Sequence, residues 1–135
     1  MTARPTGQRT DVQTPPQALG VLGEELAFHE LRRRGYKVLL RNYECSLGEI
    51  DLIAKHEGFL VFVEVKTRSS DDMGSPAEGV TPEKRRQIVR VAQYYLKRYG
   101  IQDVPCRFDV VAVRIPPHQE PQLEVLVSAF GEGLC

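Results

Sequence analysis

Two neighbouring segments of the chain carry charged side chains that could together bind a metal ion and hydrolyse a phosphate ester. Glu49 and Asp51 lie two residues apart in the first segment. Glu64 and Lys66 have the same spacing in the second. Carboxylate oxygens are preferred ligands of Mg²⁺ and Mn²⁺, and such an ion polarises a phosphate oxygen and activates a water molecule. These residue types therefore suit phosphodiester hydrolysis, with Asp51 and Glu64 as the metal ligands.

The spacing predicts that a β-hairpin positions these four residues. A Glu-Gly dipeptide at positions 57–58 separates two apolar segments and has the composition of a two-residue hairpin turn. Counting back from this turn places Asp51 opposite Glu64, and Glu49 opposite Lys66. Since side chains alternate along a strand, all four would share one face. Two carboxylates that face each other repel, and a divalent cation between them would neutralise both.

Lys66 admits two interpretations. It could orient the attacking water or stabilise negative charge that develops on the phosphate. Alternatively, it pairs with Glu49 or Glu64 at a solvated end of the strand, and the charges are purely structural. The pattern leaves both interpretations open.

A predicted helix at the start of the chain offers a fourth candidate, Glu24. Glu24, Ala27 and Leu31 have the spacing of one helix face, so Glu24 would point toward the sheet with its apolar neighbours. The alternative is an ordinary solvated glutamate beside Glu25. We therefore treat Glu24 as a candidate catalytic residue and metal ligand.

Turn signals and apolar periodicity predict the elements that surround the hairpin. The chain is expected to form one domain over residues 14–128, with a flexible tail at 1–13 and a second tail at 129–135. The predicted elements are a helix from the N-cap Thr14 to Gly35, strands at 38–43, 49–55 and 59–68, a helix that opens at Thr81-Pro82, a strand at 108–115 and a short edge strand at 123–127. This order, α-β-β-β-α-β with a further edge strand, indicates an α/β fold with a mixed β-sheet flanked by helices.

The second predicted helix has a clear apolar stripe, which should pack on the sheet. Its members recur at helical spacing: Ile88, Val91, Ala92, Tyr95, Leu96 and Tyr99.

Basic residues near the predicted site are candidates for contact with nucleic-acid phosphates. The chain as a whole is neutral, with 18 basic and 18 acidic residues, so any such contact depends on local clusters. A solvated helix surface is the alternative for each of them. The candidates are Arg68, Lys84, Arg85 and Arg86. The loop over residues 69–79 follows the second hairpin strand directly and is expected to be a mobile loop on the substrate side.

Arg107 and Asp109 have opposite charges and alternate on one face of a predicted strand. They could form a buried structural pair or hold the site residues in place through contacts outside the site, and we favour the structural pair.

Composition also indicates where the protein works. The longest apolar run, residues 59–63, is too short to span a membrane, and the charges and prolines at the start of the chain do not resemble a secretory signal. A cytoplasmic protein without a membrane partner is expected. Cys45, Cys106 and Cys135 are widely spaced and odd in number, which predicts isolated reduced thiols.

Several short motifs occur in order between about Gly20 and Val113, and together they resemble the YraN-like family of uncharacterised bacterial proteins. This combination is far more specific than a single E-x-K. The motifs are Gly23-Glu24 with Ala27, Gly35-Tyr36, Arg41-Asn42, Gly48-Glu49-Ile50-Asp51-Leu52-Ile53, Phe62-Val63-Glu64-Val65-Lys66-Thr67-Arg68, Lys84, and Arg107-Phe108-Asp109-Val110-Val111.

That family is similar to the PD-(D/E)xK proteins, the restriction-endonuclease-like superfamily, and its core resembles Holliday-junction resolvases. The resemblance implies that Asp51 is the first acid of the motif, Glu64 the second and Lys66 its lysine. Glu24 matches the helix-one glutamate of resolvase-like members. Ile50 replaces the proline that gives the motif its name.

The resemblance implies an endonuclease that uses Mg²⁺ or Mn²⁺ and acts on DNA rather than RNA, on branched or recombination intermediates. Resolvase-like relatives cut as dimers, so a homodimer is one expectation. Two other functions fit the same fold. One is a nucleic-acid-binding protein that does not cut, and the other is an interaction or assembly domain in which the hairpin charges are structural.

Overall fold

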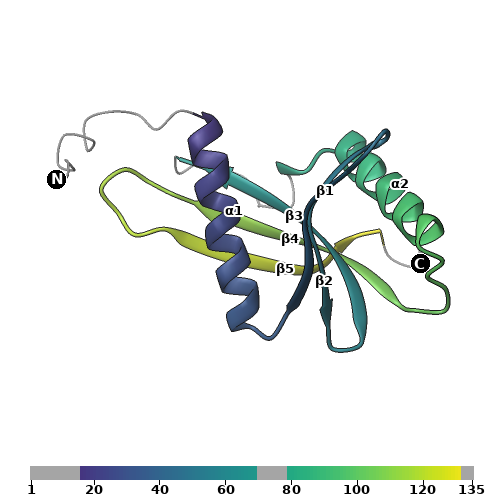
Figure 1. Cartoon of the computed structure of the whole chain (residues 1–135). Coiled ribbons are helices and arrows are strands. Elements are labelled where there is room, and N and C mark those ends of the chain that lie inside the picture. Colours follow the sequence, from purple (N-terminus) through teal and green to yellow (C-terminus); the bar gives the residue numbers. More distant parts are fainter. Residues whose placement is uncertain (1–15, 70–78, 132–135) are drawn as a thin grey trace, which may run out of the picture.

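One open mixed sheet of five strands organises the molecule, with a helix on each side (Figure 1). The computed structural model describes residues 16–69 and 79–131. The elements are α1 (Pro16–Arg33), β1 (Lys37–Cys45), β2 (Gly48–His56), β3 (Phe59–Arg68), α2 (Pro82–Arg98), β4 (Cys106–Arg114) and β5 (Gln122–Phe130). The α/β class and the order of elements are as predicted, and β5 is longer than the strand expected at 123–127.

Helix boundaries follow local backbone chemistry. The predicted N-cap Thr14 lies outside the described residues, whereas α1 ends as predicted before Gly35, whose φ of +94° suits glycine. At the start of α2 the side chain of Thr81 accepts a hydrogen bond of 3.1 Å from the backbone N–H of Lys84. This confirms the predicted cap.

The strands neighbour one another in chain order. β1, β2 and β3 are antiparallel, β3 and β4 are parallel and connected through α2, and β5 is antiparallel to β4. The turn between β2 and β3 has positive φ at both Glu57 and Gly58, 52° and 85°, as a type I′ turn requires. His56 pairs with Phe59 directly beside it, which confirms the predicted hairpin.

Alternation along the central strand β3 produces two hydrophobic cores, one on each face of the sheet. Val61 and Val63 face α1 and join a core that includes Ala27 and Leu31. Leu60 and Phe62 face α2 and join a core of mostly apolar residues that also contains, among others, Ile50, Ile53, Ile88, Val91, Ala92, Tyr95, Phe108 and Val110. Strand β3 is therefore apolar on both faces until Glu64, and the predicted central strand is confirmed.

The apolar stripe of α2 is buried over most of its length. Ile88, Val91, Ala92 and Tyr95 are buried as predicted, and Leu96 is partly buried. Tyr99 is 56% exposed because it is the C-cap, where the helix ends and its side chain leaves the sheet. The prediction that the stripe continues to Tyr99 is wrong.

A buried polar network links three strands and the segment after α1. The guanidinium of Arg107 lies 2.9 Å from Asp109, which is fully buried. Tyr36 donates a 2.7 Å hydrogen bond to the same carboxylate, and the backbone N–H of Ser128 donates another at 3.0 Å. The Tyr36 ring stacks on His56 with 3.9 Å between ring centroids. The structural role favoured for Arg107 and Asp109 agrees with this arrangement.

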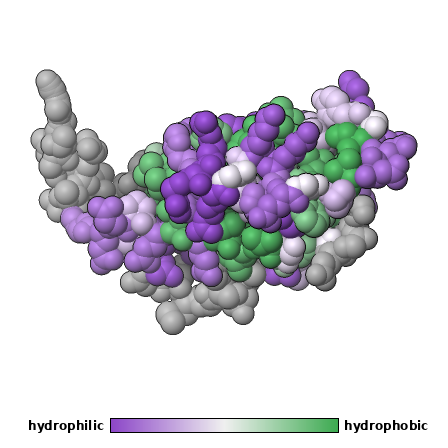
Figure 2. Space-filling model, turned by 90° about the horizontal axis from the view of Figure 1, so that it is seen from below, coloured by the Kyte–Doolittle hydropathy of each residue, from purple (hydrophilic) through white to green (hydrophobic). Residues whose placement is uncertain are grey.

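On the side seen from below, hydrophilic side chains and apolar areas lie next to each other (Figure 2). Neither helix of the described residues carries an apolar stretch long enough to cross a membrane. Cys45 is a free thiol. The prediction of isolated reduced thiols is wrong for Cys106, which is disulfide-bonded, because wide spacing in sequence sets no lower limit on distance in the fold.

Candidate active site

The candidate site lies where β2 and β3 stop pairing. The regular ladder runs from the turn to the pair Leu52 and Val63 and ends there. Beyond it, the backbone N–H of Val65 donates a 2.8 Å hydrogen bond to Oδ2 of Asp51 instead of to a backbone carbonyl. The predicted register is confirmed as far as Leu52 and Val63, and at the next position, where Asp51 was predicted opposite Glu64, a side chain takes the place of the next ladder bond.

The predicted pair of Glu49 and Lys66 also lies beyond the regular ladder between β2 and β3. Ile50 and Ile53, three residues apart, both pack in the α2-side core, so the alternation expected of a regular strand is interrupted between them. The four charged side chains consequently do not form two opposed pairs on one regular face.

Asp51 and Glu64 nevertheless meet through their side chains, which share a hydrogen bond. Burial raises the pKa of Asp51, and the Val65 N–H, which favours its charged form, opposes that rise. Burial and the nearby charge of Asp51 raise the pKa of Glu64 to about 8. Two half-buried carboxylates in contact thus hold a proton between them at neutral pH.

Two further carboxylates surround Asp51. Burial, followed by the charge of Asp51, raises the pKa of Glu24 on α1. The same two causes, in the same order, raise the pKa of Glu49 on β2. Glu24 therefore lies toward the sheet, as its helix spacing predicted.

Asn42 contacts both of these outer acids and was not assigned a role from the sequence. With its amide nitrogen oriented toward them, Asn42 donates hydrogen bonds of 3.0 Å to Glu24 Oε1 and 3.1 Å to Glu49 Oε2. Its φ is +55°, although it lies within β1. The Arg41-Asn42 dipeptide belongs to the motifs quoted above, and asparagine tolerates the left-handed region better than most residues. That combination is the signal that could have identified it.

Two lysines complete the charged surroundings. The positive charges of Lys84 and Lys66 both lower the pKa of Glu64, against the larger effects that raise it. Lys84, in the first turns of α2, also acts on Asp51 and Glu49. Neither lysine forms an ion pair with a carboxylate among residues 16–69 and 79–131. The interpretation of Lys66 as an ordinary ion-pair partner therefore lacks the contact that it requires.

Glycines allow both helices to approach the site closely. A Cβ on Gly23 of α1 would lie 2.8 Å from Cγ2 of Thr67 and still nearer to its Oγ1, which is too close for real atoms. A Cβ on Gly48 would lie 2.7 Å from Nε2 of Gln87 on α2, which itself donates a 3.2 Å hydrogen bond to the carbonyl of Leu47. The glycine beside Glu24 thus has a packing reason.

The pair of Asp51 and Glu64 has the chemistry of a divalent-cation site. Both carboxylates supply hard oxygen donors, and their shared proton occupies a place that a cation could take. No group of three or more His, Cys, Asp or Glu side chains is arranged to hold a metal ion within the described part of the chain. The residues present therefore fit a cation held by two carboxylates, with Glu24 and Glu49 as the next acids.

The predicted phosphate contacts divide into two groups. Lys84, whose charge acts on the acids, and Arg86 line an open hollow of about 540 Å³ at the start of α2, together with Glu83. The side chains of Arg68 and Lys66 both lie beside Gly79, where an added Cβ would be 2.5 Å from Nη2 of Arg68 and 3.4 Å from Cγ of Lys66. Arg85 points elsewhere. It donates a 2.8 Å hydrogen bond to the carbonyl of Val80 and lies over the ring of Phe130.

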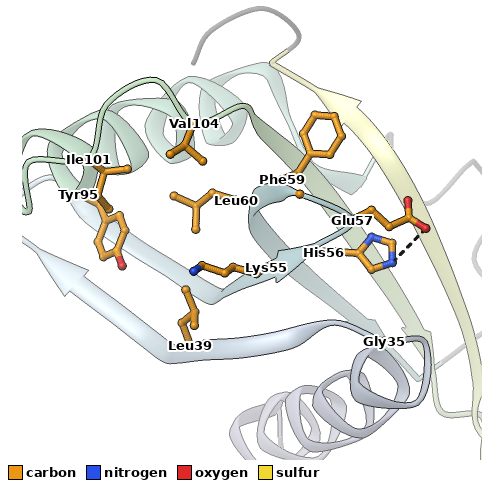
Figure 3. Close-up of a pocket in the computed structure, with 11 residues that line it drawn as sticks. Gly35, Leu39, Lys55, His56, Glu57, Phe59, Leu60, Tyr95, Ile101 and Val104 are labelled. Atoms are coloured by element: carbon orange, nitrogen blue, oxygen red, sulfur yellow. Dashed lines mark ion pairs between the residues drawn. The ribbon is translucent and has the colours of Figure 1, made fainter.

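A second cavity, of about 490 Å³, lies at the opposite end of the hairpin (Figure 3). Its lining is mainly apolar and comes from β1, the ends of β2 and β3 with the turn between them, α2 and the segment after α2, with Leu39, Phe59, Leu60, Tyr95, Ile101 and Val104 among its members. None of the predicted site residues lines this cavity. It is thus separate from the acidic cluster.

Comparison with known proteins gives a consistent set of relatives. A family model described as "Uncharacterised protein family UPF0102" matches residues 23–113. A UPF0102 protein of Caldicellulosiruptor saccharolyticus is 48% identical over 113 residues, which cover 83% of this chain and 96% of that protein. Those of Geobacter sulfurreducens and Chlorobium phaeobacteroides are 46% and 39% identical over 112 residues, covering 83% of this chain and 88% of each protein. The matched region contains all the acids and lysines described above.

Proposed function

The chain belongs to the uncharacterised protein family UPF0102, and from the site that it carries we propose that it is a divalent-metal-dependent endonuclease that hydrolyses phosphodiester bonds of DNA. One observation supports this proposal above the others. Two half-buried carboxylates, Asp51 and Glu64, share a proton at the end of the central strands, with the positive charges of two lysines acting on the pair.

In this proposal Asp51 and Glu64 hold Mg²⁺ or Mn²⁺. The cation would polarise the phosphate and make an attacking water more acidic. The Val65 N–H keeps one oxygen of Asp51 fixed and stabilises its charged form. Lys66 presents a positive charge to the phosphoryl oxygens as negative charge develops there. Lys84, whose charge acts on three of the acids, would bind the phosphate that is cut or its neighbour.

A nucleic-acid substrate is the partner that suits the surroundings of the site. Lys84, Arg86 and Arg90 line the open hollow at the start of α2, and their charges would contact successive phosphates without reading bases. The hollow is open rather than enclosed, which suits a long polymer better than a small ester. DNA, in branched or recombination intermediates, is the substrate class that we propose.

A cleavage assay with a matched control tests the proposal. The full chain is incubated in Mn²⁺ or Mg²⁺ with labelled duplex, single-stranded, flap and four-way-junction DNA, and with RNA of the same lengths. We expect cleavage of DNA that EDTA abolishes, that Asp51→Asn removes and that Glu57→Gln leaves intact. Glu57 is an exposed acid in the turn at the far end of the same hairpin. Binding of DNA without cleavage by the unmodified protein would favour a non-catalytic nucleic-acid-binding protein instead.

A further inference from the structure

Asn42 has an unusual backbone conformation for a strand residue. Its φ is +55°, in the left-handed region that non-glycine residues rarely adopt. The flanking residues Arg41 and Tyr43 remain paired with Leu52 and Ile50 on β2. Asn42 is exposed, so its conformation is not imposed by burial of its own side chain. A strained residue inside an otherwise paired strand calls for a compensating interaction.

The compensating interaction is with the two outer acids of the site. The amide of Asn42 donates to Glu24 on α1 at 3.0 Å and to Glu49 on β2 at 3.1 Å. Hydrogen bonds to charged acceptors are stronger than those between neutral groups, and an amide NH₂ can make two of them. The left-handed turn therefore places one neutral side chain between a helix carboxylate and a strand carboxylate.

The neutrality of the amide is what suits this position. Glu24 and Glu49 both lie within electrostatic range of Asp51, so the three acids repel. An arginine or lysine between them would hold the acids together but would also cancel their field. An amide holds them through hydrogen bonds and leaves their negative charge available to a cation.

We propose that Asn42 is a positioning residue of the site, which holds Glu24 and Glu49 together beside Asp51 so that the helix carboxylate acts on the bound cation. The inference rests on the proposed function, since it assigns a task within the same site. It further assigns Glu49 to the site. Loss of an outer partner of this kind commonly weakens metal binding or activity by about 10-fold to 100-fold.

A double-mutant cycle read by Mn²⁺ affinity tests this role. Asn42→Gly keeps the left-handed backbone accessible and removes the side chain with its amide. It is measured by calorimetry on the full chain, alone and combined with Glu24→Gln. We expect Asn42→Gly to weaken Mn²⁺ binding by about 10-fold. In the Glu24→Gln background, the additional loss should be less than about 2-fold, because the residue it positions is already altered.

Two controls separate positioning from a general structural effect. His118→Gly makes the same kind of change at another exposed residue with positive φ, 63°, and should leave Mn²⁺ affinity unchanged. Thermal unfolding verifies that each variant is folded. An equal loss of affinity in both backgrounds, or no loss in the first, would overturn the positioning role.

The same samples distinguish this inference from the proposed function. Mn²⁺ binding without cleavage of any substrate contradicts the nuclease, while the cycle still decides the role of Asn42. Absence of Mn²⁺ binding by the unmodified protein overturns both.

Discussion

At the scale of single residues, the decisive feature is a pair of carboxylates that the fold forces together. In the unfolded chain Asp51 and Glu64 have the ordinary acidity of aspartate and glutamate. In the folded chain burial raises the pKa of both, and their mutual contact further raises that of Glu64. Such an arrangement opposes folding when both are charged. We therefore expect the contact between the two carboxylates to lower the free energy of unfolding of the cation-free protein, by an amount that depends on pH.

Glu64→Gln should stabilise the cation-free protein at mildly alkaline pH. The pKa of Glu64 is about 8 in the folded chain and near the ordinary value of 4.5 in the unfolded chain. Between these values the folded protein keeps a proton that the unfolded chain has released, so the free energy of unfolding falls as pH rises. Gln mimics the protonated acid and removes this dependence. At pH 8 the variant should be more stable by on the order of 2 kcal/mol, and near pH 4 it should match the unmodified protein.

Urea unfolding across pH 4 to 8 in EDTA measures this difference. Glu57→Gln, in the exposed turn, serves as the matched control and should keep the pH dependence of the unmodified protein. A Glu64→Gln variant that is less stable than the unmodified protein at pH 8 would contradict the raised pKa.

Lys66→Ala should strongly reduce cleavage without lowering stability. Since Lys66 forms no ion pair with a described carboxylate, its removal breaks no such structural contact. Its loss should reduce kcat by about 100-fold to 1000-fold, as expected for a group that stabilises charge in the transition state. Lys55→Ala, an exposed lysine on β2, is the control. A clear fall in Tm together with intact cleavage would instead favour the structural interpretation of Lys66.

At the scale of elements, the site depends on how closely α1 packs against the end of β3. Gly23 allows this approach because any side chain there would overlap Thr67. Gly20, one turn earlier in the same helix, faces open space, and a Cβ added there would meet no atom of another element within 4 Å. The two glycines therefore differ in what an added side chain would contact.

The substitutions Gly20→Ala and Gly23→Ala should change the stability of the protein in opposite directions. Alanine at Gly20 improves helix propensity and should stabilise the protein by about 0.5 to 1 kcal/mol. At Gly23 the overlap with Thr67 should destabilise it by about 1 to 3 kcal/mol and move Glu24 away from Asp51. Chemical denaturation measures both, and Mn²⁺ affinity should fall for Gly23→Ala alone. Equal stability changes for the two variants would mean that the helix does not depend on this contact.

Local patterns predicted the hairpin, whereas the details of the site depend on tertiary contacts. The turn at Glu57 and Gly58 and the alternation of β3 are properties of a few adjacent residues, so the register beside the turn could be read directly. The end of the ladder at Leu52 could not, because a side chain from one strand replaces a backbone acceptor there. The Arg41-Asn42 motif marks Asn42 in the sequence, but its partners could not be predicted, since one of them lies on a helix earlier in the chain.

At the scale of the whole molecule, a buried ion pair links elements on the α1 side of the sheet. Asp109 accepts hydrogen bonds from Arg107, Tyr36 and the backbone of Ser128, so strands β4 and β5 and the segment after α1 meet at one carboxylate. A buried charge is stable only while its partners remain. The network should therefore be more important for global stability than for the chemistry at the other end of the hairpin.

Arg107→Leu should strongly destabilise the fold. It leaves the fully buried Asp109 without its cation, which typically costs about 3 to 5 kcal/mol. The double variant Arg107→Leu with Asp109→Leu should recover part of this loss, because no unpaired charge remains. Arg114→Ala, on the exposed end of the same strand, should change stability by less than about 0.5 kcal/mol. Urea unfolding of the four proteins checks the order, and a double variant worse than Arg107→Leu would contradict it.

The hydrogen bond from Val65 to Asp51 has a practical consequence for spectroscopy. This backbone amide donates to a site carboxylate rather than to a neighbouring strand, so its proton resonance should respond directly to the charge on Asp51. Titration, cation binding or the arrival of a phosphate would each shift that one peak in a nitrogen-labelled sample. The chain thus contains its own probe of the site, which needs neither a fluorescent label nor a known substrate.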